Sequence, residues 1–284
     1  MVDRALRLLD LGSMLRAMKC DLLACVVSVG SILSSPAFAS TVVQAPPEDP
    51  PISTDRPGFL FSPTVVPRGC LQFETGLPTL TIDRDSGDEV RTWTLPVAVR
   101  YGLTEKLELR ASLPTWTDLH DDRGPGSTDE TGFSDSEVGV KFQLPELSGG
   151  PLAVQASLRL PTGEDPFTTD EAGGSVYLLH GRDVGESFWL QTMVGYTYTP
   201  IDGADDGANG SIAALVSHPV ADRWSGYVEG TALPGLQNTP GQSYAGGGLV
   251  WTATHDLQFD LSADFGLDED SADVIASFGV SWRL

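Results

Sequence analysis

Charged side chains recur at alternate positions of several apolar segments, and their types and spacing suggest a shared role. The basic members are Arg100, Arg110, Lys141 and Arg159, and the acidic members are Glu74, Glu108, Glu229, Asp260 and Asp264. Opposed basic and acidic walls around a lumen would produce a transverse field that favours polar or zwitterionic solutes. The same charges could instead pair and fill a narrow interior. The second interpretation is favoured, because lumen width grows only roughly linearly with strand number.

Catalytic chemistry has little support. Of the four histidines, only His120 lies in a long acidic connection, where Asp121 and Asp122 follow it. Ser127 and Ser134 share that connection, but no nucleophile motif surrounds them. We therefore predict that the chain is not an enzyme, has no catalytic residues, and carries His120 as a loop residue.

Two acidic clusters offer oxygen ligands of the kind that Ca²⁺ or Mg²⁺ prefers. They are Asp202–Asp206 and Asp268–Asp270. Neither has EF-hand spacing, because the glycine and the terminal glutamate fall in the wrong places. Solvated loops are the default interpretation, with weak divalent bridging to lipopolysaccharide as the alternative, so no metal or cofactor is predicted.

The stretch Asp256–Gly266 shows which kind of element must position the charges. Its odd-numbered residues are all apolar and its even-numbered residues are acidic, polar or glycine. Side chains alternate between faces along a strand, whereas a helix would scatter these residues around its circumference. At about 3.3 Å per residue, the stretch can cross a tilted apolar layer of about 25–30 Å. Asp260 and Asp264 are expected to meet Arg110, Lys141 and Arg159 across the lumen.

The pattern repeats, and it predicts an all-β fold: a transmembrane, antiparallel, up-and-down β-barrel of about 12 strands. Short turns and longer acidic connections such as Trp116–Ser134 mostly alternate, as on the two rims of bacterial outer-membrane barrels. The expected strands are Leu71–Asp83, Arg91–Tyr101, Lys106–Pro114, Asp135–Leu144, Pro151–Leu160, Ser175–His180, Ser187–Thr199, Gly210–Ser217, Arg223–Leu233, Gln242–Thr252, Asp256–Gly266 and Ala272–Leu284.

The N-terminal residues read as an export signal. An apolar run over Leu22–Leu33 precedes an Ala-x-Ala cleavage site that ends at Ala39, although translation could begin at Met14 or Met18. Removing residues 1–39 removes four basic and three acidic residues, so the net charge changes from −22 to −23. That acidity argues against nucleic-acid partners. Only Cys70 would remain, which excludes an intramolecular disulfide.

Residues 40–69 are rich in proline and cannot pair within a sheet, so they are predicted to form an extended arm or a plug. Residues 52–66 are less polar than a pure linker, which suggests docking inside the barrel. Asp55, Arg56, Pro57 and Phe59 are the candidate residues of this arm. The predicted domains are then a signal peptide at 1–39, the arm at 40–69 and the barrel at 70–284.

Several stretches resemble a known family. They are Ile52–Phe59, Val66–Gly69 followed by Leu71–Gly76, and Tyr101–Leu109. Together they resemble the outer-membrane family named after the MetA pathway of phenol degradation, over roughly residues 52–284. The resemblance implies a barrel associated with the passage of aromatic or other hydrophobic compounds.

The first functional hypothesis is a passive outer-membrane channel for small, aromatic or hydrophobic solutes. The alternative is an occluded structural or surface-interaction barrel whose outer loops carry the function, and a secreted soluble β-sandwich is a more remote third. The expected partners are outer-membrane lipid, lipopolysaccharide, the barrel-assembly machinery and the solute. The expected location is the cell outer membrane, after cleavage near Ala39.

Overall fold

One antiparallel sheet contains all the strands of this computed structural model, which describes residues 50–85, 87–123, 126–200 and 206–284. The predicted signal peptide and residues 40–49 lie outside this range. The strands are β1 (Leu71–Asp85), β2 (Asp88–Leu95), β3 (Val97–Gly102), β4 (Leu107–Ser112), β5 (Trp116–Asp121), β6 (Thr128–Phe133), β7 (Ser136–Leu147), β8 (Gly150–Leu160), β9 (Gly173–Val184), β10 (Phe188–Thr199), β11 (Gly207–Ala221), β12 (Trp224–Leu233), β13 (Gly235–Gln237), β14 (Gln242–Thr254), β15 (Leu257–Gly266) and β16 (Val274–Arg283).

The sheet closes on itself, because β1 pairs with β16 from Gln72↔Arg283 to Ile82↔Val274. Four strands of the barrel are interrupted, so the segments β2/β3, β4/β5, β6/β7 and β12/β13 each form one strand of the wall. Pro96, Pro114 and Pro234 lie at three of these breaks, where proline removes a donor from the ladder. The predicted fold, an antiparallel barrel of about 12 strands, is confirmed.

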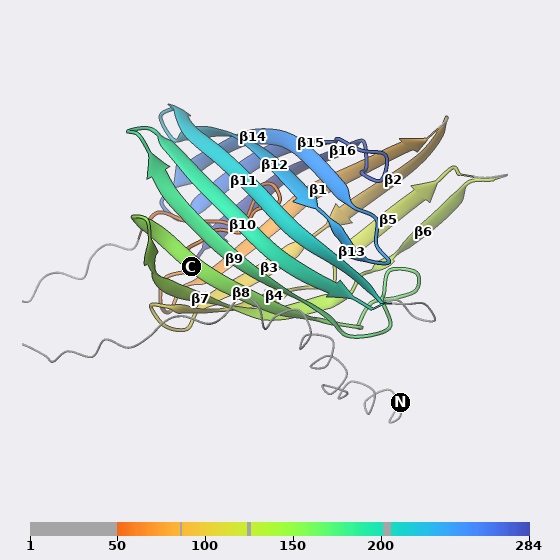
Figure 1. Cartoon of the computed structure of the whole chain (residues 1–284), viewed down its shortest axis with the longest axis horizontal. Coiled ribbons are helices and arrows are strands. Elements are labelled where there is room, and N and C mark those ends of the chain that lie inside the picture. The colour runs from red at the N-terminus through yellow and green to blue at the C-terminus, as the bar shows by residue number, and fades with distance from the viewer. Residues whose placement is uncertain (1–49, 86, 124–125, 201–205) are drawn as a thin grey trace, which may run out of the picture. The chain divides into compact units, whose positions relative to one another are not determined.

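The prediction of a loop over Trp116–Ser134 is wrong in part. Trp116–Asp121 forms β5, which pairs with β2 from Leu95↔Trp116 to Val90↔Asp121, and β6 pairs with β5. In Figure 1, β5 and β6 run out side by side from the barrel, on the same side as the neighbouring β2. Their side chains are mostly exposed or half-buried on both faces, so the apolar alternation of a barrel strand is missing there. The residue pattern of β5 and β6 therefore did not predict that these segments form strands.

The barrel is apolar outside and largely polar inside. Val138, Val140 and Phe142 of β7 are exposed on the outer face, whereas Lys141 between them is fully buried. Inside the barrel, Leu60 of the arm packs with a small apolar cluster on the wall, formed by Ala153, Leu179, Met193 and Ala213. No helix within the described residues is long and apolar enough to cross a membrane.

Candidate functional site

Residues 50–69 enter the barrel and return to the same rim. At one end of this arm, Ile52 N donates to His255 O (2.9 Å) and Arg283 Nη2 donates to Pro50 O (2.8 Å). At the other end, Gly69 N donates to Gly102 O at 2.7 Å. His255 lies in the short turn between β14 and β15, and Gly102 ends β3 at the short turn to β4, so the arm is anchored at the short-turn rim. The rest of the arm contacts side chains that point into the barrel.

Asp55 of the arm meets three cations that we call the basic wall: Arg100 of β3, Arg110 of β4 and Lys141 of β7. Asp55 Oδ2 lies 2.6 Å from Arg110 Nη2, and Oδ1 lies 2.9 Å from Lys141 Nζ and 3.5 Å from Arg100 Nη1. The Asp55 side chain is only 6% exposed. Burial by itself would raise the pKa of Asp55, but the nearby Arg100, Arg110 and Lys141 hold it far below its ordinary value.

Two wall carboxylates complete this cluster. Glu108 accepts hydrogen bonds from Arg100 Nε and Nη2, both at 2.9 Å, and from Arg110 Nη1 at 2.8 Å. Glu74 lies 2.6 Å from Arg100 Nη1 and also accepts from the backbone N–H of Asp55. Arg100, Lys141, Glu74 and Glu108 are buried, and the side chains of Arg110 and Asp55 are only 11% and 6% exposed, so the charges stabilise one another in place of water.

Arg56, the next residue of the arm, contacts what we call the acidic wall: Glu229 of β12 with Asp260 and Asp264 of β15. Arg56 Nη2 lies 3.2 Å from Asp260 Oδ1 and 2.6 Å from Ser277 Oγ. Glu229 Oε2 accepts the backbone N–H of Phe59 at 3.0 Å. Glu229, Asp260 and Asp264 each keep one buried oxygen without a hydrogen-bond partner among the described residues.

Eight of the nine residues predicted to line the lumen lie in these two clusters, five around the basic wall and three on the acidic wall. Arg159 is only half-buried on β8, and no ion pair with it occurs within the described residues. The expected pairing of Asp260 and Asp264 with Arg110, Lys141 and Arg159 is wrong. Those charges do not meet across the lumen, because Asp55 and Arg56 of the arm reach each wall first.

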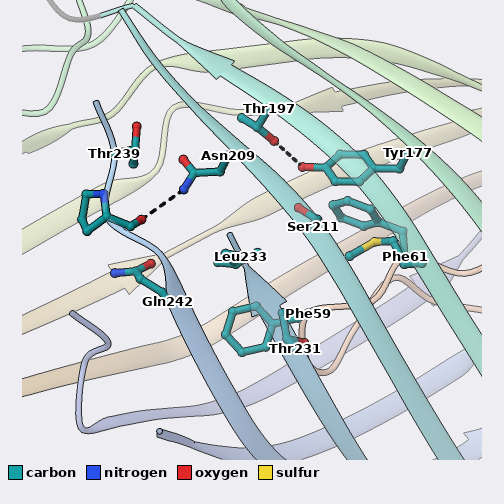
Figure 2. Close-up of a pocket in the computed structure, with 12 residues that line it drawn as sticks. Phe59, Phe61, Tyr177, Thr197, Asn209, Ser211, Thr231, Leu233, Thr239 and Gln242 are labelled. Atoms are coloured by element: carbon teal, nitrogen blue, oxygen red, sulfur yellow. Dashed lines mark hydrogen bonds between the residues drawn. The ribbon is translucent and has the colours of Figure 1, made fainter. Parts of the chain in front are cut away.

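A pocket of about 350 Å³ lies beside the arm, toward the strand ends that carry the long loops. Phe59 and Phe61 of the arm form part of its lining, together with Tyr177 of β9 and Met193 of β10, and Figure 2 shows these rings beside the pocket. Phe59 stacks on Tyr244, and Phe61 packs edge-on against Tyr177, with ring centroids 4.9 and 5.1 Å apart. The remaining lining residues are uncharged: Thr197, Asn209, Ser211, Thr231, Leu233, Thr239, Pro240 and Gln242.

Two ends of this pocket are held in place by hydrogen bonds visible in Figure 2. Tyr177 Oη lies 3.0 Å from Thr197 Oγ1, and Asn209 Nδ2 donates to Pro240 O at 3.3 Å. An apolar body with a few polar groups around it is the usual composition of a small-molecule pocket. Sequence reasoning missed Phe61 and Tyr177. The apolar triplet Phe59-Leu60-Phe61 inside a proline-rich stretch was the available signal.

His120 lies on the β5–β6 hairpin and far from this interior. Its Nδ1 is 2.6 Å from Asp129 Oδ1 and its Nε2 is 3.3 Å from Asp122 Oδ2. The hydrogen bond with Asp129 raises the pKa of His120. Within the described residues, no group of three or more potential ligands could hold a metal ion, and residues 201–205 of one acidic cluster lie outside that range.

The comparisons with known proteins agree with this fold. Residues 54–284 match the model of the family described as "Putative MetA-pathway of phenol degradation". An outer membrane channel from Pseudomonas putida F1 superposes with a TM-score of 0.61 at 10% identity, covering 78% of this chain and 97% of that one. No curated protein sequence matches.

Two further structures are similar. The NanC porin gives a TM-score of 0.51 at 11% identity, with 75% and 100% of the two chains covered. The translocator domain of the autotransporter NalP from Neisseria meningitidis gives 0.51 at 12% identity, with 77% and 90% covered. At such identities the likeness establishes the fold alone.

Proposed function

This chain belongs to the MetA-pathway family of phenol degradation, and from that premise we propose that it is an outer-membrane channel for the passive passage of small aromatic or hydrophobic solutes. Its partners are then the outer-membrane lipid and lipopolysaccharide around it, the barrel-assembly machinery that inserts it, and the solute.

The pocket is the observation that carries this proposal. Its volume of about 350 Å³ suits a single aromatic ring with a small substituent, and none of its lining residues is charged. Phe59, Phe61 and Tyr177 offer ring faces and edges on which a planar solute can pack. The hydroxyl and amide groups of Ser211, Thr231 and other residues can bond one polar substituent.

The arm lies inside the barrel beside the pocket, and we propose that it closes the lumen. It is held by ion pairs at Asp55 and Arg56 and by the packing of Leu60. Passage through the barrel therefore requires the arm to move, and the proposed resting state is closed. A solute that packs against Phe59 and Phe61 contacts the element that must move.

Flux into proteoliposomes tests the proposal, with benzyl alcohol as the neutral solute. We expect flux above that of protein-free vesicles, and a reduction of about tenfold in a Ser211→Trp variant that fills the pocket. Ser187→Trp, in an exposed turn, is the matched control and should not change flux. Equal flux in wild type and Ser211→Trp would refute the pocket as the route.

The alternative function, an occluded barrel that acts through its outer surface, is favoured by the β5–β6 hairpin beyond the rim. Deleting the tip between β5 and β6 separates the two possibilities. A channel keeps its flux after that deletion, whereas a surface-interaction barrel loses its function with permeability unchanged.

A further inference from the structure

The three cations of the basic wall outnumber by one the carboxylates that the barrel strands place beside them. Arg100, Arg110 and Lys141 supply three cations, and Glu74 and Glu108 supply two carboxylates. The third carboxylate is Asp55, which belongs to the arm and not to the wall. We infer that the basic wall is a binding site for one carboxylate, that Asp55 is its internal ligand, and that a small apolar monocarboxylate solute competes with Asp55 for it.

Lys141 shows most clearly that the wall by itself lacks an anion. Its side chain is 0% exposed, and its Nζ donates to Asp55 Oδ1 at 2.9 Å and to Ser62 O at 2.8 Å. Both of these partners belong to the arm. Glu74 and Glu108 are already engaged by Arg100 and Arg110. A buried ammonium without an anionic partner is strongly unfavourable, so any displacement of Asp55 creates demand for another anion.

The geometry around Asp55 is that of a carboxylate cradle. One oxygen faces Arg110 Nη2 at 2.6 Å. The other accepts from Lys141 Nζ and from the backbone N–H of Ser62 at 2.7 Å. The contact from Lys141 is a charge-assisted hydrogen bond, which is stronger than a neutral one, and the contact with Arg110 is a close ion pair. The donors on the wall would serve a solute carboxylate equally well.

Phe61 connects this cradle to the pocket. The Phe61 ring lines the pocket, and Arg110 Cζ lies 5.5 Å from the centroid of this ring. A solute with an aromatic or apolar body in the pocket would bring its carboxylate to Arg110 once Phe61 turns aside. The acidic wall repels a second negative charge, which favours monocarboxylates over dicarboxylates. The inference deepens the proposed function, because such a solute reaches the cradle only through the lumen.

Binding to the full chain in detergent tests the inference without relying on flux. Benzoate and benzyl alcohol are titrated into wild type and into Asp55→Ala. The internal carboxylate acts at an effective concentration on the order of millimolar. We therefore expect Asp55→Ala to bind benzoate at least tenfold more tightly than wild type, with benzyl alcohol binding equally to both. Adding Lys141→Met should abolish the gain.

Asp55→Ser is the second variant if Asp55→Ala does not refold, because its side chain is polar and shorter than that of Asp55 and leaves room for a formate ion. Formate should raise its unfolding temperature, and chloride at the same ionic strength should not. Equal benzoate affinity in wild type and Asp55→Ala would overturn the inference, as would a gain that survives Lys141→Met or equal effects of formate and chloride. A barrel that binds benzoate but passes no benzyl alcohol would reject the proposed channel and keep this site.

Discussion

Asp55 Oδ2 lies 2.6 Å from Arg110 Nη2 on the basic wall, while the next residue, Arg56, lies 3.2 Å from Asp260 on the acidic wall. Two adjacent residues of opposite charge therefore join two differently charged parts of one barrel. The basic wall has one cation more than the carboxylates on the neighbouring strands, and the acidic wall has carboxylates only. The arm supplies Asp55 to the first and Arg56 to the second. The docked arm is consequently part of the electrostatic structure of the barrel and not only a steric obstacle.

Asp55→Asn should loosen the arm. Removing one partner of a buried charge cluster typically costs roughly 3–5 kcal/mol, because the remaining charges stay buried and unpaired. We expect a lower unfolding temperature, followed by the heat-dependent gel shift of the barrel, and longer open times in planar bilayers. Glu186→Gln changes a carboxylate in an exposed turn and should leave both measurements unchanged. Unaltered conductance together with a lowered unfolding temperature would show that the arm is structural and does not gate.

Arg56→Gln should destabilise the acidic side of the arm. The Asp260 side chain is fully buried, and Arg56 is its ion-pair partner within the described residues. Asp260→Asn in the same chain should restore part of the loss, because no uncompensated charge then remains. A double-mutant cycle on unfolding free energy measures the coupling, which should be about 0.5–3 kcal/mol for groups in one network. Strict additivity of the two substitutions would contradict the pairing.

Gly102→Ala should weaken the anchoring of the arm at the rim. A Cβ at Gly102 would lie 2.0 Å from Pro67 O and 2.4 Å from Val66 O, which are backbone atoms that cannot rotate away. The arm must therefore shift, and the hydrogen bond from Gly69 N to Gly102 O is strained. Gly230→Ala is the matched control on β12, because nothing lies within 4 Å of its Cβ. Hydrogen exchange over residues 60–70 should rise in the first variant alone.

Asp135→Asn should release the connection between β8 and β9. Asp135 accepts from the backbone N–H groups of Gly163 and Thr169, both at 3.0 Å, and from the hydroxyls of Thr168 and Thr169. Burial opposes ionisation, but these hydrogen bonds lower the pKa of Asp135 below its ordinary value.

Because the pKa of Asp135 is lower in the folded loop than in the unfolded chain, its charge stabilises the folded loop at any pH above the unfolded pKa of about 3.9. This stabilisation is lost as the pH falls through the lower pKa of the folded state. The hydrogen-exchange protection factors of residues 161–172 should therefore be constant down to about pH 4 and fall below it. The Asp135→Asn variant should exchange faster at neutral pH and lose this pH dependence. A wild-type loop equally protected at pH 3 and pH 6 would contradict the role of Asp135.

The β5–β6 hairpin provides a second pH test with the opposite sign. The hydrogen bond with Asp129 raises the pKa of His120 in the folded hairpin. The stabilisation from this contact is therefore fully present at a pH below the ordinary pKa of histidine, and it is lost as the pH rises through the raised pKa. Protection of residues 117–121 and 128–133 should be greater at pH 6 than at pH 9. His120→Gln should remove that difference, and its persistence in the variant would assign it elsewhere.

The faces of the strands follow from the order of residue types alone. Side chains alternate strictly along an extended chain, so residues such as Leu261 and Asp260 had to lie on opposite sides of any strand. The strand number followed from the repetition of that pattern. Where the chain leaves the apolar layer the pattern fails, because both faces meet water, and the β5–β6 hairpin was missed for that reason.

Which charges meet, in contrast, depends on how the strands and the arm are placed in the folded barrel. The alternation predicts that a side chain points into the barrel, but it does not predict its position along the barrel axis or the strand that it faces. Both depend on strand register and on how the barrel closes. Arg56 and Asp260 are 204 residues apart, and nothing local relates them. The arm has no strand period, so its path could be found only from the apolar and ionic contacts that it makes inside. Those contacts place the arm between the charged side chains of the predicted lumen, with an uncharged pocket beside it.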